Sequence, residues 1–324
     1  MLTIAIPTYN RAKYLNLCLV RISEEIDSLS KAECSLIQVC VVDNASTDDT
    51  PIVVSHHQEK FGNKLDVIRN DCNMGMDFNF TRCYEQAKTP YVWLLGDDDI
   101  ITPGGLKKVL EVLVGSEIDI LYVNNYWFQD SYKDKPKKNE RHGTLKFRSS
   151  LDFARYTNVM LTFLSGLIVR SGVGMGHRSG FSNSNLVQLS WVLPLLSDGS
   201  NFMAIKDWVI AAKGSNSSGY GLVQVFGFNL VKITNDILST EPVIARAIQN
   251  GAIVNFFSGF IMEFRNGMSL FSDRDMAIGL KLAFGNNWRY YVFLAPLIKL
   301  PLFVANYYLI FLKVIRRLFL SVLL

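Results

Sequence analysis

The chain has 324 residues, of which 49% are hydrophobic and only 19% are charged, and its formal net charge is +4. This length predicts one large domain or about two, and it excludes a small scaffold that needs disulfide bonds to stay folded. The apolar composition also predicts that part of the surface contacts lipid or a partner protein.

Five cysteines are scattered through the chain without Cys-x-x-Cys spacing. We interpret them as reduced core residues, which is typical of proteins on the cytosolic side of a membrane. The sequence begins directly with a strand-like run and shows no basic leader region, so we expect no signal peptide.

The first 125 residues alternate short β-branched runs with helical patterns. This alternation predicts a mostly parallel sheet whose strands are joined by crossover helices. We expect strands at Leu2–Ile6, Leu36–Val42, Leu65–Arg69, Tyr91–Leu95 and Ile118–Val123. We expect helices after Asn10, which we interpret as an N-cap, and at Asp48–Phe61, Asp77–Ala87 and Gly104–Gly115.

Polar segments follow four of these predicted strands. They are Pro7 to Arg11, Asp43 to Thr50, Asn70 to Gly75, and Gly96 to Asp99. Open α/β sheets bind ligands beyond the carboxyl ends of their strands, so we expect the four segments to meet in one crevice.

The segment Gly96-Asp97-Asp98-Asp99 places three carboxylates where a buried strand reaches the surface. Carboxylate oxygens are ligands that Mg²⁺ and Mn²⁺ prefer, usually shared with the phosphates of a substrate. The alternative is an acidic turn or a helix N-cap before Pro103. The three other polar strand ends favour the metal and phosphate interpretation.

The rest of the chain divides by composition. The stretch Gln129 to Arg148 is rich in lysine, and we interpret it as a solvated loop or hairpin. The alternative is that its lysines bind an anionic acceptor. Glycines between positions 172 and 180 indicate a turned or mobile loop over the site. Residues 216–287 have a helical pattern, and residues 288–324 are nearly continuously apolar.

The apolar tail carries the basic side chains Lys313, Arg316 and Arg317 and four tyrosines, Tyr290, Tyr291, Tyr307 and Tyr308. Its uncharged stretch is too short for an ordinary spanning helix. The pattern predicts an amphipathic helix that lies in an anionic membrane leaflet. A buried helix or an oligomer interface is the alternative.

Taken together, Ile4 to Arg11, Val41 to Asp48, Asn70 to Gly75 and Leu94 to Asp99 resemble family 2 glycosyltransferases of the GT-A fold. The Gly-Asp-Asp-Asp form of the acidic segment is similar to that of bacterial O-antigen transferases of the abequosyltransferase subgroup. The resemblance implies an α/β, Rossmann-like GT-A sheet flanked by helices, followed by a helical, membrane-associating C-terminal region. The catalytic domain would be 1–215, with a nucleotide-binding half at 1–125 and an acceptor half at 126–215; regions 216–287 and 288–324 would follow it.

The resemblance also implies roles for individual residues, most of them contacts to a nucleotide-sugar donor. The base and ribose would be lined by Pro7, Thr8, Tyr9 and Arg11, and Asp43 would accept a hydrogen bond from the base. The loop that carries Asp43 would be supported by Asn44, Ser46 and Asp48. The nucleotide and diphosphate would be bordered by Arg69, Asn70, Asn73 and Gly75, and Asp97 would lie near the ribose or donor sugar. Asp98 would bind the Mg²⁺ or Mn²⁺, and Asp99 would act beside it as a second catalytic carboxylate. Gly96 stands where the family's Asp-x-Asp motif has its first acid.

The family usually places its general base, an Asp or Glu, a few residues ahead of a Trp. Here the segment Phe181–Pro194, which contains Trp191, has no acidic residue. The base is therefore unassigned, and the candidates are Asp198, Asp207, His177 and a second use of Asp99.

These features predict an inverting, metal-dependent glycosyltransferase that moves a sugar from a nucleotide-sugar donor to a lipid-linked, polyprenyl-diphosphate-bound oligosaccharide. Such a protein would act in the synthesis of O-antigen or capsule, bound peripherally to the cytoplasmic face of the bacterial inner membrane, without a nucleic-acid partner. One alternative is a sugar nucleotidyltransferase, although the Gly-rich loop of that class is replaced by Pro7 to Arg11. Another is a non-catalytic scaffold that binds nucleotide sugars within a polysaccharide assembly complex, which the missing base favours.

Overall fold

The computed structural model describes residues 1–136, 141–173, 180–214, 221–267 and 276–323. These residues form two compact units, the first from residues 1–148 and 163–214 and the second from residues 149–162 and 215–324. The segment 149–162, which sequence analysis placed in the acceptor half of the catalytic domain, therefore clusters with the C-terminal residues.

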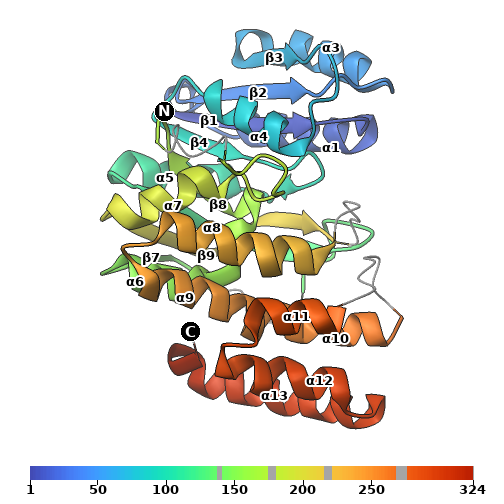
Figure 1. Ribbon diagram of the computed structural model, residues 1–324. Helices are drawn as coiled ribbons and strands as arrows, with labels where there is room; N and C mark the ends of the chain where they lie inside the picture. The colour runs from blue at the N-terminus through green and yellow to red at the C-terminus, as the bar shows by residue number, and fades with distance from the viewer. Residues whose placement is uncertain (137–140, 174–179, 215–220, 268–275, 324) are drawn as a thin grey trace. The chain divides into compact units, whose positions relative to one another are not determined.

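The first unit is built on a mixed sheet with strand order β3-β2-β1-β4-β8-β6-β9-β5, with β7 paired to β9, and Figure 1 shows β3, β2, β1 and β4 side by side. The strands are β1 Leu2–Thr8, β2 Ile37–Asp43, β3 Leu65–Arg69, β4 Tyr91–Leu94, β5 Ile100–Ile101, β6 Ile120–Phe128, β7 Thr144–Lys146, β8 Leu167–Arg170 and β9 Phe202–Lys213. Strands β1 to β4 are parallel, β8 runs antiparallel between β4 and β6, and β9 is parallel to β6.

The helices of this unit are α1 Ala12–Asp27, α2 Lys31–Cys34, α3 Thr50–Phe61, α4 Met76–Glu85, α5 Gly105–Gly115 and α7 Leu189–Asp198, with short 3₁₀ turns at Gly62–Lys64 and Leu164–Gly166. The predicted strands and crossover helices of the first 125 residues are confirmed to within a few residues. Antiparallel β8 and the β5–β9 and β7–β9 pairs were not predicted.

Helices cover both faces of the parallel strands, as the near-continuous apolar character of those strands requires. On one face, Ile4 of β1 joins a buried cluster with Leu19 of α1 and Leu106 of α5. On the other face, Tyr84 of α4 stacks on Trp191 of α7 with ring centroids 4.5 Å apart. The carboxyl ends of β1 to β4 consequently open along one edge between these two helical layers.

The predicted N-cap at Asn10 is wrong. Helix α1 begins at Ala12, whose amide donates to the Asp48 carboxylate at 3.0 Å, while the Asn10 side chain accepts from the Thr47 amide at 2.7 Å. Both bonds join the ends of β1 and β2, so a tertiary contact replaces the local cap.

The second unit is helical. It contains α6 Ser150–Thr157, α8 Leu230–Ile237, α9 Pro242–Gly251, α10 Ser258–Arg265, α11 Met276–Phe284, α12 Ala295–Lys299 and α13 Leu302–Leu323, with a 3₁₀ turn at Asn158–Thr162 and π-helical turns at Val223–Asn229, Ala252–Phe257 and Tyr290–Leu294. In the part of the chain that the structure describes, none of the helices has the length and apolar character needed to cross a membrane.

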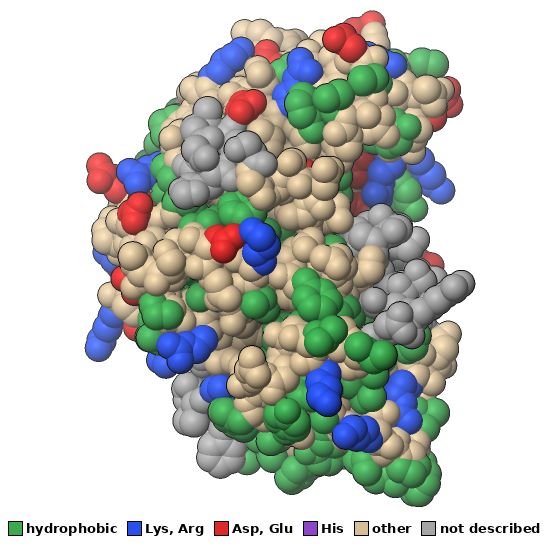
Figure 2. All heavy atoms as spheres, in the orientation of Figure 1, with side chains coloured by type: hydrophobic (Ala, Val, Ile, Leu, Met, Phe, Trp, Pro, Cys, Tyr) green, Lys and Arg blue, Asp and Glu red, His purple; other side chains and the backbone are tan. Residues whose placement is uncertain are grey.

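Helix α13 is buried along one narrow side and exposed along another. Ala305 and Leu312 are buried, whereas Phe303, Tyr307 and Phe311 are 68%, 74% and 54% exposed. Figure 2 shows hydrophobic side chains gathered over α12 and α13, with Lys and Arg side chains among them. This unit therefore presents an apolar, basic surface.

We predict that Gly199→Ala lowers the free energy of unfolding by about 1–3 kcal/mol, because it overpacks a closed site. A Cβ at Gly199 would lie 2.4 Å from the Leu195 carbonyl oxygen and 2.7 Å from Asp119 Oδ2. The matched control is Gly115→Ala at the end of α5, where a Cβ meets nothing within 4 Å. It should leave stability unchanged or raise it by up to about 1 kcal/mol, as measured by urea denaturation. Equal stability of the two variants would contradict the packing described here.

Candidate active site

The acidic segment after β4 contacts the end of β1. Thr8 Oγ1 donates to Asp97 Oδ2 at 2.8 Å, and Arg11 Nε lies 3.2 Å from Asp97 Oδ1. The same guanidinium forms an ion pair with Asp98 through Nη2. Arg11 therefore binds two of the three carboxylates.

The three carboxylates are crowded and mostly buried. Burial raises the pKa of Asp97 to about 7, although Arg11 opposes the shift. Burial raises the pKa of Asp99 to about 7 as well, and the neighbouring charge of Asp98 adds to the effect. Because buried like charges disfavour one another, a site of this kind favours an additional cation.

Gly96 lies close to three side-chain oxygen atoms that leave little room for a side chain. A Cβ at this position would lie 3.2 Å from Asp99 Oδ2, 3.3 Å from Asp98 Oδ1 and 3.4 Å from Ser165 Oγ. Ser165 Oγ also accepts from the Gly96 amide at 2.8 Å. Two carboxylates and a hydroxyl are hard oxygen donors of the kind that Mg²⁺ and Mn²⁺ prefer, and Asp98 and Asp99 would be the residues to hold such an ion.

In the described parts of the chain, no three Asp, Glu, His or Cys side chains lie close enough to form a metal site by themselves. A cation at Asp98 would therefore need further oxygen ligands from a substrate. Mg²⁺ commonly takes such ligands from phosphates.

The end of β2 is joined to the ends of β1 and β3. Arg69 forms an ion pair with Asp43 and donates to the Ser46 carbonyl oxygen at 2.7 Å. The Ser46 amide donates to Asp43 Oδ1 at 2.9 Å, and Ser46 Oγ accepts from the Asn10 amide at 2.8 Å. Asp43 is thus fixed at the crevice with both carboxylate oxygens occupied by protein donors.

The amide side chains after β2 and β3 form one network. Asn44 Nδ2 donates to Asn73 Oδ1 at 2.7 Å and to the Gly75 carbonyl oxygen at 3.2 Å. Asn44 Oδ1 accepts from Asn70 Nδ2 at 2.8 Å and from the Met74 amide at 3.0 Å. The network fixes the path of residues 70–75 against β2.

Two residues of α4 complete this network and were not assigned from sequence. Asn79 is buried and donates to the Val42 carbonyl oxygen at 3.0 Å, and Arg82 donates to Asn70 Oδ1. Their spacing of three residues places them on one face of the helix, and this could have predicted their role, because polar residues that face a buried sheet need hydrogen-bond partners.

The remaining predicted donor contacts have different environments. Pro7 is buried within β1, opposite Val42, and Tyr9 is 40% exposed beyond the strand end. Asp48 binds the first turn of α1, as described above. The structure therefore brings the four predicted segments together, with Pro7 and Asp48 in structural positions of the crevice wall.

The proposed bases differ sharply in position. Asp207 forms ion pairs with Lys108 and His142 and accepts from the Gly143 amide, and hydrogen bonds from these groups hold its pKa well below its usual range despite some burial. Asp198 is exposed at the end of α7, beside Gly199 and Asp119, at the edge of the sheet where β6 begins. Neither residue therefore fits a base at the carboxyl edge.

The other two candidates are Asp99 and His177. Asp99 lies in the acidic segment and accepts from the Lys213 amide at 2.9 Å. His177, like the glycines at 174 and 176, lies outside the described residues.

A Rossmann-like sheet whose carboxyl edge carries buried carboxylates, an arginine and Asx-rich loops defines an α/β domain of the GT-A type. Residues 3–173 match the family Glycosyl transferase family 2, and the chain belongs to this family.

Relatives and solved structures agree with this assignment. The chain is 32% identical over 120 residues to abequosyltransferase RfbV of Salmonella typhimurium, a match that covers 37% of this chain and 34% of that protein. The chain spans between a third and about half the length of the first curated relatives that it matches.

Among solved structures, S. aureus TarS 1–349 in complex with UDP superposes with a TM-score of 0.62 at 19% identity, covering 96% of this chain and 88% of that one. Mannosyltransferase PcManGT from Pyrobaculum calidifontis, in complex with GDP-Man and Mn²⁺, gives a TM-score of 0.52 at 16% identity, covering 97% and 86% of the two chains. At these identities the likeness establishes the fold.

We predict that Ser165→Ala destabilises the first unit by about 1–3 kcal/mol, because it removes the partner of the Gly96 amide and a hydrogen bond to Asp99. Ser190→Ala is the matched control. Both serines are fully buried, but no partner of Ser190 Oγ is found among the described residues, so its removal should be neutral or stabilising. Thermal unfolding of both variants checks the difference. A cost at Ser190 equal to that at Ser165 would refute the role given to Ser165.

Proposed function

We propose that the protein is an inverting, metal-dependent glycosyltransferase that transfers a sugar from a nucleotide-sugar donor to a lipid-linked oligosaccharide. The observation that carries the proposal is the buried carboxylate set around Gly96, placed beside Arg11 at the edge where the ends of β1, β2 and β3 meet. This arrangement would place a cation and the diphosphate of a donor beside the same polar strand ends.

In the proposed reaction, the bond between the anomeric carbon and the donor diphosphate breaks while an acceptor hydroxyl attacks from the opposite side. A bound divalent cation supplies electrostatic stabilisation of the departing diphosphate. Asp98 and Asp99 would hold that cation, and Arg11 would contribute a further positive charge to the same edge. Asp43, fixed by Arg69, would orient the nucleotide.

The acceptor proposal rests on the C-terminal unit and on one relative. The name of abequosyltransferase RfbV denotes a sugar transferase, and we propose that this chain likewise transfers a sugar, in the assembly of a bacterial surface polysaccharide. Exposed aromatic residues on α13, together with exposed Lys313 and Arg317, would hold the protein on the cytoplasmic face of an anionic inner membrane. The acceptor in this proposal is a polyprenyl-diphosphate-linked saccharide of that membrane.

A non-catalytic scaffold that binds nucleotide sugars is the second candidate. It is favoured by one observation, the absence of an acidic residue in the segment 181–194 where the family usually carries its base. Turnover of a donor would exclude it.

Asp98→Ala should lower sugar transfer by about 10²- to 10³-fold or more, because it removes a metal ligand that acts on the leaving group. The donor is first identified by scanning nucleotide sugars for hydrolysis with and without Mn²⁺. The variant should also lose the stimulation of donor binding by Mn²⁺ in calorimetry, with an unchanged circular dichroism spectrum. Asp66→Asn, a partly exposed carboxylate on β3 that pairs with Lys88, is the control and should retain activity. Full activity of Asp98→Ala would contradict the metal role.

Replacing Phe303, Tyr307 and Phe311 together by glutamate should weaken binding to phosphatidylglycerol vesicles by roughly tenfold or more, because all three side chains are exposed. Point substitutions test the exposed surface more specifically than deletion of residues 288–324, because the deletion would also remove the buried Phe293 and Leu297. The control Ile52→Glu alters a 68% exposed residue of α3. Cosedimentation with vesicles measures the effect, and undiminished binding of the triple variant would rule out α13 as the membrane surface.

A further inference from the structure

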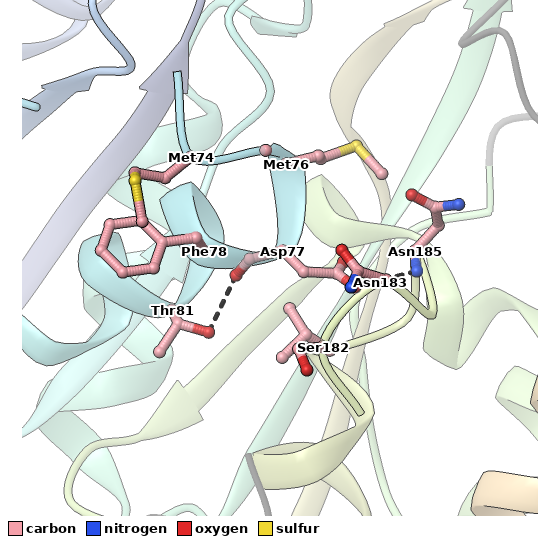
Figure 3. Close-up of a pocket in the computed structure, with 10 residues that line it drawn as sticks. Met74, Met76, Asp77, Phe78, Thr81, Ser182, Asn183 and Asn185 are labelled. Atoms are coloured by element: carbon pink, nitrogen blue, oxygen red, sulfur yellow. Dashed lines mark hydrogen bonds between the residues drawn. The ribbon is translucent and has the colours of Figure 1, made fainter. Parts of the chain in front are cut away.

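A cavity lies in the first unit, between the start of α4 and the segment that precedes α7, and its wall is partly polar and partly apolar (Figure 3). Its volume is about 370 Å³, within the range of small-ligand sites. It is lined by Met74, Gly75, Met76, Asp77, Phe78, Thr81, Ser182, Asn183, Asn185 and Val187.

Asp77 is the acidic residue of this lining, and its side chain points toward Asn183 and Asn185 in Figure 3. The residue is only 6% exposed. Its Oδ2 atom accepts from the Asn185 amide at 3.0 Å, while no partner for the buried Oδ1 atom is found among the described residues. Since a buried carboxylate oxygen without a donor is costly, the atom is suited to a hydroxyl supplied by a ligand.

The lining combines two kinds of surface. Ser182, Asn183 and Asn185 bring hydroxyl and amide groups on one side, Met74 and Phe78 bring apolar surface on the other, and Met76 adds apolar surface near Asn185. A sugar ring has the same division between hydroxyl groups at its rim and C–H groups on its faces. The cavity therefore fits a saccharide better than an apolar or a strongly anionic ligand.

The loop that brings the amides has an unusual backbone. Asn183 and Asn185 have φ angles of +65° and +57°, a region that asparagine tolerates better than most residues. Strained positions of this kind persist where the surrounding structure holds them. The bond from the Asn185 amide to Asp77 is one such restraint.

The cavity adjoins the donor crevice. The Gly75 carbonyl oxygen in its lining accepts from Asn44 at 3.2 Å. Two residues after Asp77, Asn79 donates to the Thr8 carbonyl oxygen at 3.5 Å, and the Thr8 hydroxyl binds Asp97. The helical turn that carries Asp77 is thus joined to the acidic segment through Asn79 and Thr8.

We infer that this cavity binds the terminal sugar of the acceptor and that Asp77, from α4, takes the proton of the attacking hydroxyl. The inference rests on the proposed function. In the step, the acceptor oxygen forms a bond to the anomeric carbon as its proton passes to Asp77 Oδ1. The bond from that carbon to the diphosphate breaks, and the diphosphate leaves with the electron pair.

This assignment resolves the missing base. The segment 181–194 lacks an acid, but its Asn185 amide lies against the Asp77 carboxylate, so an acid from another element occupies the same neighbourhood. Burial raises the pKa of Asp77, although hydrogen bonds from the amides of Asn185, Ser184 and Val187 and from the Ser184 hydroxyl oppose the shift. A carboxylate with a raised pKa is a stronger proton acceptor when it is ionised.

The sugar site is tested first by saturation-transfer NMR with the methyl glycosides of glucose, galactose, mannose and rhamnose. At least one should receive saturation from the full-length protein. Phe78→Ala should abolish the signal while leaving the fold intact, since Phe78 is 42% exposed. Absence of binding by every glycoside, or binding unaffected by Phe78→Ala, would overturn the sugar site.

The proton transfer is tested with Asp77→Asn, using the identified donor and the glycoside that binds. The variant should lower kcat by about 10²- to 10⁴-fold while the donor Kd stays within about twofold of the parent value. Asp119→Asn is the matched control, a buried carboxylate that also accepts backbone amides, from Ser200 and Asn201. Its kcat should be unchanged.

The outcomes separate the two proposals. If Asp77→Asn keeps its kcat, or loses activity only through a lower Tm or weaker donor binding, Asp77 is a positioning residue and the inference is wrong. If no nucleotide sugar is bound or hydrolysed, the proposed function itself fails, and the glycoside NMR still decides whether the cavity binds a sugar.

Discussion

The first unit depends on one electrostatic constraint, the concentration of negative charge at the carboxyl edge of its sheet. Asp97, Asp98 and Asp99 lie in a row at the end of β4, and Arg11 binds only two of them. Burial of uncompensated charge is expensive, so the surroundings supply donors such as the hydroxyls of Thr8 and Ser165 and the amide of Lys213. The β1 end, the 163–166 turn and the end of β9 are all held by this requirement.

The same constraint explains why the crevice is polar but rigid. Side chains that a substrate would meet already bind one another, as in the Asp43–Arg69 pair and the Asn44–Asn70 contact. Sites held this way need little rearrangement when a ligand arrives, because their rotamers are fixed beforehand. In the proposed function, this preorganisation would hold a nucleotide sugar in place.

Sequence patterns predicted the parallel strands, the crossover helices and the meeting of four strand-end segments, because each has a local signature in β-branched runs, helical spacing or turn residues. The antiparallel strand β8 was missed, since its position depends on pairing with β4 and β6 rather than on its own four residues. The Asn10 cap failed for a similar reason, because Asp48 reaches the helix from the next strand end. Asp77 gave no local signal at all, since the Asn185 amide that defines its surroundings is 108 residues away in sequence.

Gly96 also constrains how the acidic motif can change over time. A side chain there would enter the space bounded by Asp98, Asp99 and Ser165, so an acid at position 96 and an acid at position 99 compete for the same volume. A single substitution that restored the usual Asp-x-Asp spacing would crowd a fourth carboxylate against the other three. The two positions are therefore coupled, because an acid at position 96 requires the neighbouring side chains of Asp98, Asp99 and Ser165 to move aside by a few tenths of an ångström.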